Sequence, residues 1–155
     1  MQNQLNQKET TLLQDLQNQE QICVEKYRKY AQQTHAPALK NLFNQIEQDE
    51  QTHMQTISQI LSGSVPPTSG GSQVKDNVSP HQSADYSSDD MAFKNDKYLC
   101  TDALSTEKYV SSAYNTSVFE MRNTAIRDAL NHIQKEEQQH GELIYGYMSQ
   151  NGMYS

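Results

Sequence analysis

The stretch that says most about the fold is residues 39–60, which read LKNLFNQIEQDEQTHMQTISQI. Its apolar residues recur every three or four positions, which is the period of one buried face of an α-helix. Glu50 and His53 stand in the same phase, in the middle of that face. The complete in-phase series is Leu39, Phe43, Ile46, Glu50, His53, Ile57 and Ile60. The pattern predicts a helix whose buried side carries one carboxylate and one imidazole.

The same pattern returns near the end of the chain, in the series Ile126, Leu130, Ile133, Glu137, His140, Ile144 and Tyr147. Each of these two helices follows another helical stretch that has a single in-phase glutamate, Glu20 in the first half and Glu107 in the second. No stretch alternates with period two, as a strand would. Four such stripes pack together as an antiparallel four-helix bundle, so we expect an all-α fold.

Residues 62–90 differ from both halves, because they hold three of the four prolines and three of the six glycines. We therefore expect a single domain, 1–155, made of a helical hairpin at 3–61, a linker at 62–90 and a second hairpin at 91–149. Pro37 and Asn123 mark the break inside each hairpin, since they suit the first turn and the N-cap of a helix. An extended chain gains about 3.3 Å per residue. The linker is therefore long enough to cross over the bundle, which would make the third helix parallel to the second.

The two halves are related by an offset of 87 residues. Sliding residues 8–63 onto residues 95–150 gives 12 identities in 56 positions. The in-phase glutamates of each half are also 30 residues apart, and their midpoints fall at His35 and Arg122, beside the predicted breaks. Equidistant residues of a hairpin meet at one height, so a pseudo-twofold axis would bring six side chains to one level. The pairs are Glu20 with Glu107, Glu50 with Glu137, and His53 with His140.

Four glutamates inside an apolar bundle are costly unless their charge is compensated. Two divalent cations balance four carboxylates, and two neutral imidazoles complete the ligand set. A Glu from each of two helices and a Glu-x-x-His from each of the others is the ligand pattern of di-iron and di-manganese carboxylate bundles. We predict a site for two divalent ions, iron or manganese, with the ligands Glu20, Glu50, His53, Glu107, Glu137 and His140. The alternative is a decayed site kept as a buried polar network.

Other chemically active residues have simpler interpretations. Tyr27 and Tyr114 each follow a glutamate by seven positions, and are the candidate catalytic residues, as electron donors or hydrogen-bond donors to a bridging ligand. Core packing is the alternative for both. Cys23 is expected to be a small buried residue, because its counterpart is Val110. A surface position is expected for His35, His81 and His132, and a solvated one for Glu25, Glu47, Asp49, Glu120, Glu136 and Glu142.

The composition excludes several classes of function. The formal net charge of -7 argues against nucleic acid as a partner, since phosphate binding needs a basic face. No apolar run approaches the roughly 18 residues of a membrane span, and no signal peptide is visible at the N-terminus. Two cysteines make no disulfide scaffold. Leu, Ile, Val and Phe together number only 27, a scarcity that is typical of disordered chains and raises the question of whether there is a core.

The order Glu, Glu-x-x-His, Glu, Glu-x-x-His resembles the ferritin-like superfamily of rubrerythrins and bacterioferritins. Bacterioferritins also have a tyrosine seven residues after the first glutamate, as Tyr27 follows Glu20. The stretches 135–148 and 151–154, KEEQQHGELIYGYM and NGMY, resemble more specifically the coat-F family of bacterial spore coat proteins. No Cys-x-x-Cys pair is present, so the rubredoxin-type iron centre of rubrerythrins is not expected.

These resemblances imply a protein of the spore coat, made in the cytoplasm of a spore-former. They imply other spore coat proteins and a second copy of the chain, as a dimer, as its partners. The implied chemistry is redox at two bridged metals, of a peroxidase, catalase or ferroxidase type. The rival interpretation is a purely structural coat component, in which the metals are a staple or are absent. The Gln-rich surface and the nine tyrosines would then serve assembly.

Overall fold

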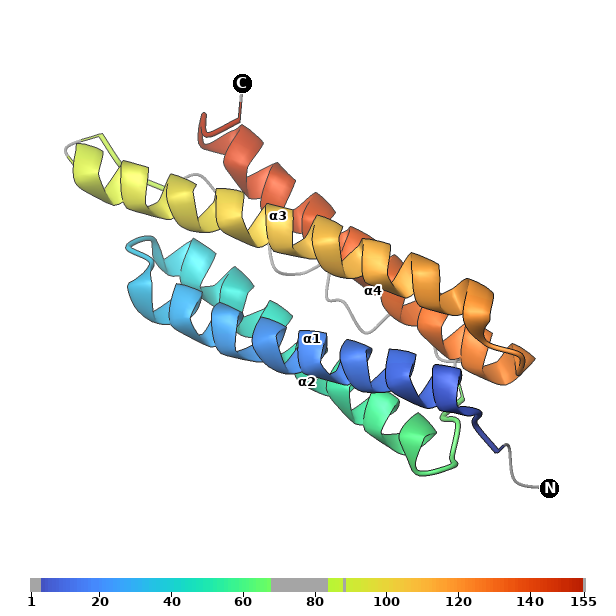
Figure 1. Ribbon diagram of the computed structural model, residues 1–155. Helices are drawn as coiled ribbons and strands as arrows, with labels where there is room; N and C mark the ends of the chain where they lie inside the picture. The colour runs from blue at the N-terminus through green and yellow to red at the C-terminus, as the bar shows by residue number, and fades with distance from the viewer. Residues whose placement is uncertain (1–3, 68–83, 88, 155) are drawn as a thin grey trace.

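The computed structural model describes residues 4–67, 84–87 and 89–154, and within them the chain is all α-helical. Helix α1 spans Gln7–Gln33, α2 spans Pro37–Leu61, α3 spans Asp90–Glu120 and α4 spans Thr124–Gln150. Figure 1 shows α1 with α2, and α3 with α4, as two antiparallel pairs that lie against each other along their length. The prediction of an all-α four-helix bundle is confirmed.

Local sequence signals set the helix ends. Asn6 and Glu9 form a reciprocal capping box at the start of α1, and Asp89 caps α3 by accepting a hydrogen bond from the backbone of Ala92. Pro37 opens α2, and the Asn123 side chain caps α4, as their positions in the sequence predicted. Both hairpin breaks are therefore where the sequence placed them.

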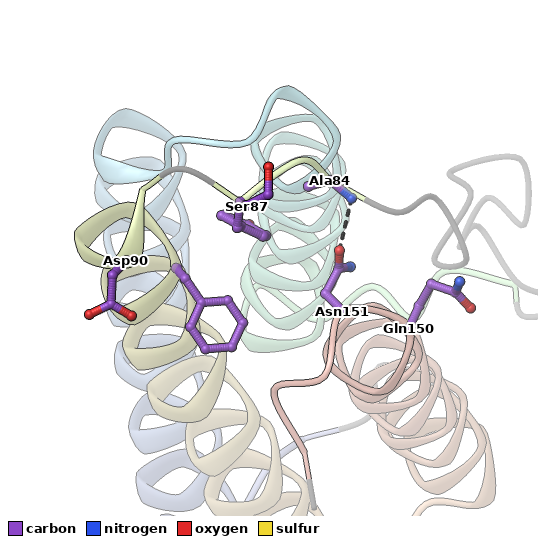
Figure 2. A pocket seen from close by; sticks show the side chains of 7 residues that line it. Ala84, Ser87, Asp90, Gln150 and Asn151 are labelled. Carbon is purple, nitrogen blue, oxygen red and sulfur yellow. Dashed lines mark hydrogen bonds between the residues drawn. The ribbon is translucent and has the colours of Figure 1, made fainter.

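The connection between α2 and α3 joins opposite ends of the bundle. In Figure 1, α2 ends near the N-terminus of the chain, whereas α3 begins at the opposite end, so the two helices run parallel. At its far end the connection is attached to the bundle. The backbone N–H of Ala84 donates to Asn151 Oδ1 over 2.8 Å, beside a surface pocket that Ser87, Asp90 and Phe93 also line (Figure 2).

In each hairpin, a buried acid accepts hydrogen bonds from the backbone of the turn in the other hairpin. Glu9 of α1 accepts a hydrogen bond from the backbone N–H of Arg122 in the α3–α4 turn, over 2.9 Å. Asp96 of α3 accepts from the backbone N–H groups of His35 and Ala36 in the α1–α2 turn, over 2.9 and 3.1 Å. The offset of 87 residues relates the two acids, since 96 − 9 = 87, and also the two turn residues, since 122 − 35 = 87. The internal repeat is therefore a pseudo-twofold symmetry of the fold.

The apolar core forms two clusters along the bundle. One contains Tyr27, Leu39, Phe43 and Tyr147, and the other contains Leu13, Ile57, Val110 and Ile133, among others. In α2, α3 and α4 the predicted ligands lie between the residues of the two clusters. No helix among the described residues combines the length and apolar character that a membrane span requires.

Candidate metal centre

The six predicted ligands lie together at the middle of the bundle, and all are buried. Their exposed fractions range from 0 to 3 %. Their donor atoms form two groups, each within 4.8 Å, which are Glu20, Glu50, His53 and Glu137, and Glu50, Glu107, Glu137 and His140. Glu50 and Glu137 belong to both groups, so these two carboxylates are placed to bridge a pair of ions. Glu20 and Glu107 each belong to one group.

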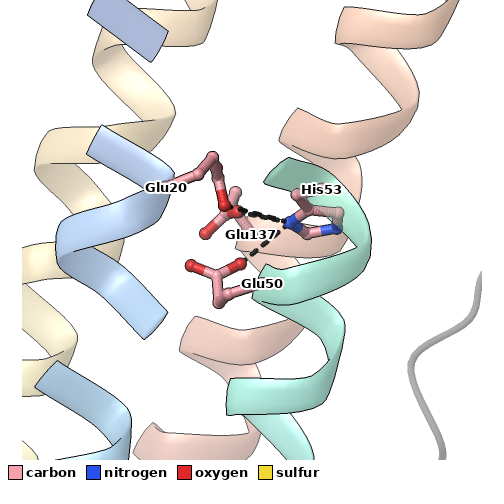
Figure 3. Close-up of side chains that lie close together, drawn as sticks. All are labelled: Glu20, Glu50, His53 and Glu137. Carbon is pink, nitrogen blue, oxygen red and sulfur yellow. Dashed lines mark hydrogen bonds and ion pairs between the residues drawn. The ribbon is translucent and has the colours of Figure 1, made fainter. Parts of the chain in front are cut away.

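Both imidazoles present Nδ1 to the carboxylates. His53 Nδ1 lies 2.8 Å from Glu50 Oε1 and 2.9 Å from Glu137 Oε1, as Figure 3 shows. His140 Nδ1 lies 3.4 Å from Glu107 Oε1 and 3.7 Å from Glu50 Oε1. The i, i+3 spacing on α2 and on α4 puts each histidine on the same helix face as its glutamate. One nitrogen of each ring therefore faces the space between the glutamates.

The other nitrogen of each ring is bound by a carboxylate of the opposite hairpin. His53 Nε2 donates to Glu136 Oε1 over 2.7 Å, and His140 Nε2 donates to Asp49 Oδ2 over 2.9 Å. Metal-bound histidines commonly donate their second N–H to a carboxylate, which fixes the ring and its tautomer. Both rings are therefore oriented with Nδ1 directed toward the glutamates.

The expectation that Asp49 and Glu136 are solvated is wrong, because they are only 4 % and 1 % exposed. Each helix of a four-helix bundle contacts two neighbours, so its buried arc is wider than a single apolar stripe. Asp49 and Glu136 occupy the edge of that arc, between α2 and α4. The sequence does contain their signal, because 136 − 49 = 87 and each precedes a predicted ligand by one residue.

Tyr27 and Tyr114 both reach the centre, where each binds a glutamate of the other hairpin. Tyr27 donates its phenolic O–H to Glu107 Oε1 over 2.5 Å, and Tyr114 donates to Glu20 Oε1 over 2.7 Å. Burial and the neighbouring carboxylates raise the pKa of both phenols well above 10, so both stay protonated donors. The tyrosines also pack in the core, as the ring of Tyr27 does against Phe43.

The donor set fits divalent cations. Each of the four glutamates keeps one buried oxygen without a hydrogen-bond partner, namely Oε2 of Glu20, Glu50, Glu107 and Glu137. His140 Nδ1 is a fifth buried atom in this condition. Buried acceptors without a partner are destabilising, whereas a cation bound between them would satisfy them together. Oxygen and imidazole ligands suit iron and manganese.

The pKa values of residues in the centre also indicate that its negative charge needs compensation. Burial, followed by the charges of the neighbouring glutamates, raises the pKa of Glu50 and of Glu137 well above 4.5. Burial would lower the pKa of His140, but Glu107 and Asp49 raise it to about 10. Without a cation, the centre therefore holds protons that compensate its carboxylates.

The remaining candidates lie away from the ligand positions. Cys23 is buried, as expected, and burial together with the nearby glutamates raises the pKa of its thiol. His35 is exposed, and His132 is partly exposed with its Nε2 3.5 Å from Glu136 Oε2. His81 lies outside the described residues. Glu25, Glu47, Glu120 and Glu142 are not buried, as expected.

A comparison with known families gave a match in the second half of the chain. Residues 95–155 match the Coat F domain, which covers most of α3, all of α4 and the C-terminal tail. Comparisons with curated proteins and with solved structures gave no significant match. The four-helix arrangement and the buried carboxylate–histidine clusters are consistent with a ferritin-like fold. Residues 95–155 are therefore similar to the Coat F domain, and this part of the chain supplies Glu107, Glu137 and His140 of the buried centre.

Proposed function

We propose that the chain is a metal-binding spore coat protein whose buried centre holds two iron or manganese ions. The single observation that carries this proposal is the set of five buried atoms without hydrogen-bond partners, drawn from Glu20, Glu50, Glu107, Glu137 and His140. All five residues belong to the two groups whose donor atoms lie within 4.8 Å of one another. A merely structural polar network would be expected to satisfy its buried acceptors internally.

In this proposal every residue of the centre has a defined role. Glu50 and Glu137 would be shared by the two ions, Glu20 and Glu107 would each hold one ion, and His53 and His140 would complete the ligand set. Tyr27 and Tyr114 hold one oxygen of Glu107 and of Glu20, which leaves the second oxygen of each free to bind. When bound, iron or manganese would supply redox chemistry toward oxygen or peroxide. The surrounding apolar clusters keep bulk water away from the ligands.

The Coat F match supports a location in the spore coat. Other coat proteins and a second copy of the chain are the partners that we propose. The outer surface of α3 offers side chains for such contacts, since Met91, Tyr98, Tyr109 and Phe119 are each at least 64 % exposed. These residues favour the second candidate function, a structural coat component in which the metals serve only as a staple. A structural component could also lack the metals, and where metal is bound, catalysis separates the two functions.

Metal loading of the full chain tests the proposal. Protein freed of metal with a chelator, and then loaded with Fe²⁺ or Mn²⁺, should bind about two ions per chain by elemental analysis. Glu50→Ala removes a bridging ligand and should lose at least one ion. Glu47→Ala, a change at a partly exposed acid on the same helix, is the matched control and should retain both. A wild-type chain that binds no iron or manganese would overturn the proposal.

Catalysis needs a second measurement on the loaded protein. Consumption of oxygen or peroxide by the iron- or manganese-loaded chain should fall to the level of free metal in Glu137→Ala, which lacks the other bridging ligand. If wild type and Glu137→Ala consume both oxidants at the same slow rate, the centre is a structural staple and the second candidate function holds.

A further inference from the structure

The six proposed ligands obey the pseudo-twofold symmetry, but the side chains behind them do not. Behind His53 lie Glu136 and then His132, whereas behind His140 lie Asp49 and then Gln45. The offset relates both layers, since 136 − 49 = 87 and 132 − 45 = 87. The same ligand is thus supported by different residues in the two halves of the centre.

The supporting contacts have different geometry and chemistry. On the His53 side, Glu136 Oε1 accepts from His53 Nε2 over 2.7 Å, and Glu136 Oε2 lies 3.5 Å from His132 Nε2. On the His140 side, Asp49 Oδ2 accepts from His140 Nε2 over 2.9 Å, and Gln45 Nε2 donates to Asp49 Oδ1 over 3.2 Å. His132 is 25 % exposed, so its ring connects Glu136 to the protein surface.

This difference bears on the metals because a carboxylate that accepts a histidine N–H sets the orientation and basicity of that ligand. A Glu side chain has one more rotatable bond than Asp, so Glu136 has more freedom to leave its histidine than Asp49 has. The contact with His132 restricts that freedom. The contacts at His53 Nδ1 are also shorter than those at His140 Nδ1, at 2.8 and 2.9 Å against 3.4 and 3.7 Å.

We propose that His132 is a positioning residue that holds Glu136 on His53, and that it makes the two metal positions unequal in affinity. The inference rests on the proposed function, because it requires that the centre binds two ions. Gln45 has the same role at the other position, where it holds Asp49 on His140. The affinity of each metal position would therefore depend on a different side chain that does not itself bind the ion.

Titration of the metal-free full chain with Co²⁺ alone tests this inference. Wild type should bind two ions in two resolved steps by calorimetry. Loss of a direct partner of a metal-bound histidine costs about 10- to 100-fold in affinity, and His132 and Gln45 lie one contact further out. His132→Ala should therefore weaken one step by roughly tenfold or less and leave the other within twofold. Gln45→Ala is the matched variant and should weaken the other step.

Proton NMR of the cobalt-loaded chain supplies a signature that a merely structural role would not produce. The N–H proton of each metal-bound ring gives its own shifted signal, and His132→Ala should move one of the two while Gln45→Ala moves the other. The metal-free melting temperatures of both variants should equal that of wild type. Two bound ions with no change in either step for His132→Ala would overturn the inference, as would weakening of the same step by both variants. Failure of wild type to bind cobalt would instead overturn the proposed function.

Discussion

At the scale of single residues, the centre is built from contacts that cross between the hairpins. Glu20 and Glu107 are each held by a tyrosine of the other hairpin, and His53 and His140 each by a carboxylate of the other hairpin. Each partner satisfies one atom of a ligand and leaves another atom directed at the centre. Removal of such a partner should therefore change the free energy of unfolding or the metal affinity, and the two effects can be measured separately.

Tyr114→Phe tests the stability effect. The change deletes the hydrogen bond to Glu20 Oε1 and leaves both oxygens of that buried carboxylate without a partner. We expect the free energy of unfolding of the metal-free chain to fall by about 1–3 kcal/mol. Urea denaturation measures it, and Tyr109→Phe, at a 64 % exposed position, should change it by less than about 0.5 kcal/mol. Equal losses in the two variants would contradict the assigned role.

Asp49→Ala tests the effect on metal binding. The change removes the acceptor for His140 Nε2, so the ring loses its fixed orientation. We expect the affinity for one of the two ions to fall by about 10- to 100-fold in a metal titration. Gln48→Ala, at the neighbouring exposed position, should retain both affinities. An unchanged isotherm for Asp49→Ala would show that the carboxylate does not support the ligand.

At the scale of helices and turns, each hairpin depends on an acid from the other. Burial opposes ionisation of Glu9, but hydrogen bonds and charge from Arg122 outweigh it and lower the pKa of Glu9 to about 2. The folded-state pKa therefore lies below the ordinary value of 4.5. The resulting stability is present above pH 4.5 and is lost as the pH falls toward 2.

Glu9→Gln should remove this pH dependence. The wild-type chain should be more stable than the variant by about 1 kcal/mol at pH 7, a value reduced because the Arg122 side chain is largely exposed and screened. The difference should shrink steadily between pH 4.5 and pH 2. Urea midpoints across this range measure it, with Asp15→Asn at an exposed position as the control. A constant difference at every pH would contradict the contribution of Glu9.

The sequence was sufficient to predict the elements but not all of their contacts. Periodicity, Pro37 and Asn123 located the helices and breaks, and the offset of 87 brought the six ligands together. The buried roles of Asp49, Glu136, Glu9 and Asp96 were not predicted, because isolated acids on a polar helix are usually solvated. Only the packing of one hairpin against the other shows that these acids face backbone N–H groups or imidazoles.

At the scale of the whole molecule, much of the negative charge lies inside the bundle. Among the described residues the buried acids are Glu9, Glu20, Asp49, Glu50, Asp96, Glu107, Glu136 and Glu137. They account for eight of the 19 acidic residues, so the surface is far less acidic than the net charge of -7 suggests. The small number of apolar residues has the same origin, since a layer of the interior is polar. The chain folds as an ordered bundle, with four of these acids gathered at one level.

Metal binding should therefore stabilise the whole fold. A ligand that binds only the folded state adds about 2.7 kcal/mol per site at a free concentration 100-fold above its dissociation constant. We expect the metal-loaded chain to melt several degrees above the metal-free chain by calorimetry, and Glu137→Ala to lose most of that increase. Equal melting temperatures with and without metal would contradict a stabilising role for the ions.

Anomalous scattering from crystals of the chain loaded with iron or manganese tests the central claim most directly. Data collected on both sides of the metal's absorption edge should show two peaks inside the bundle. One is expected between Glu20, Glu50, His53 and Glu137, and the other between Glu50, Glu107, Glu137 and His140. Absence of both peaks, or peaks confined to the surface, would contradict a buried two-metal centre.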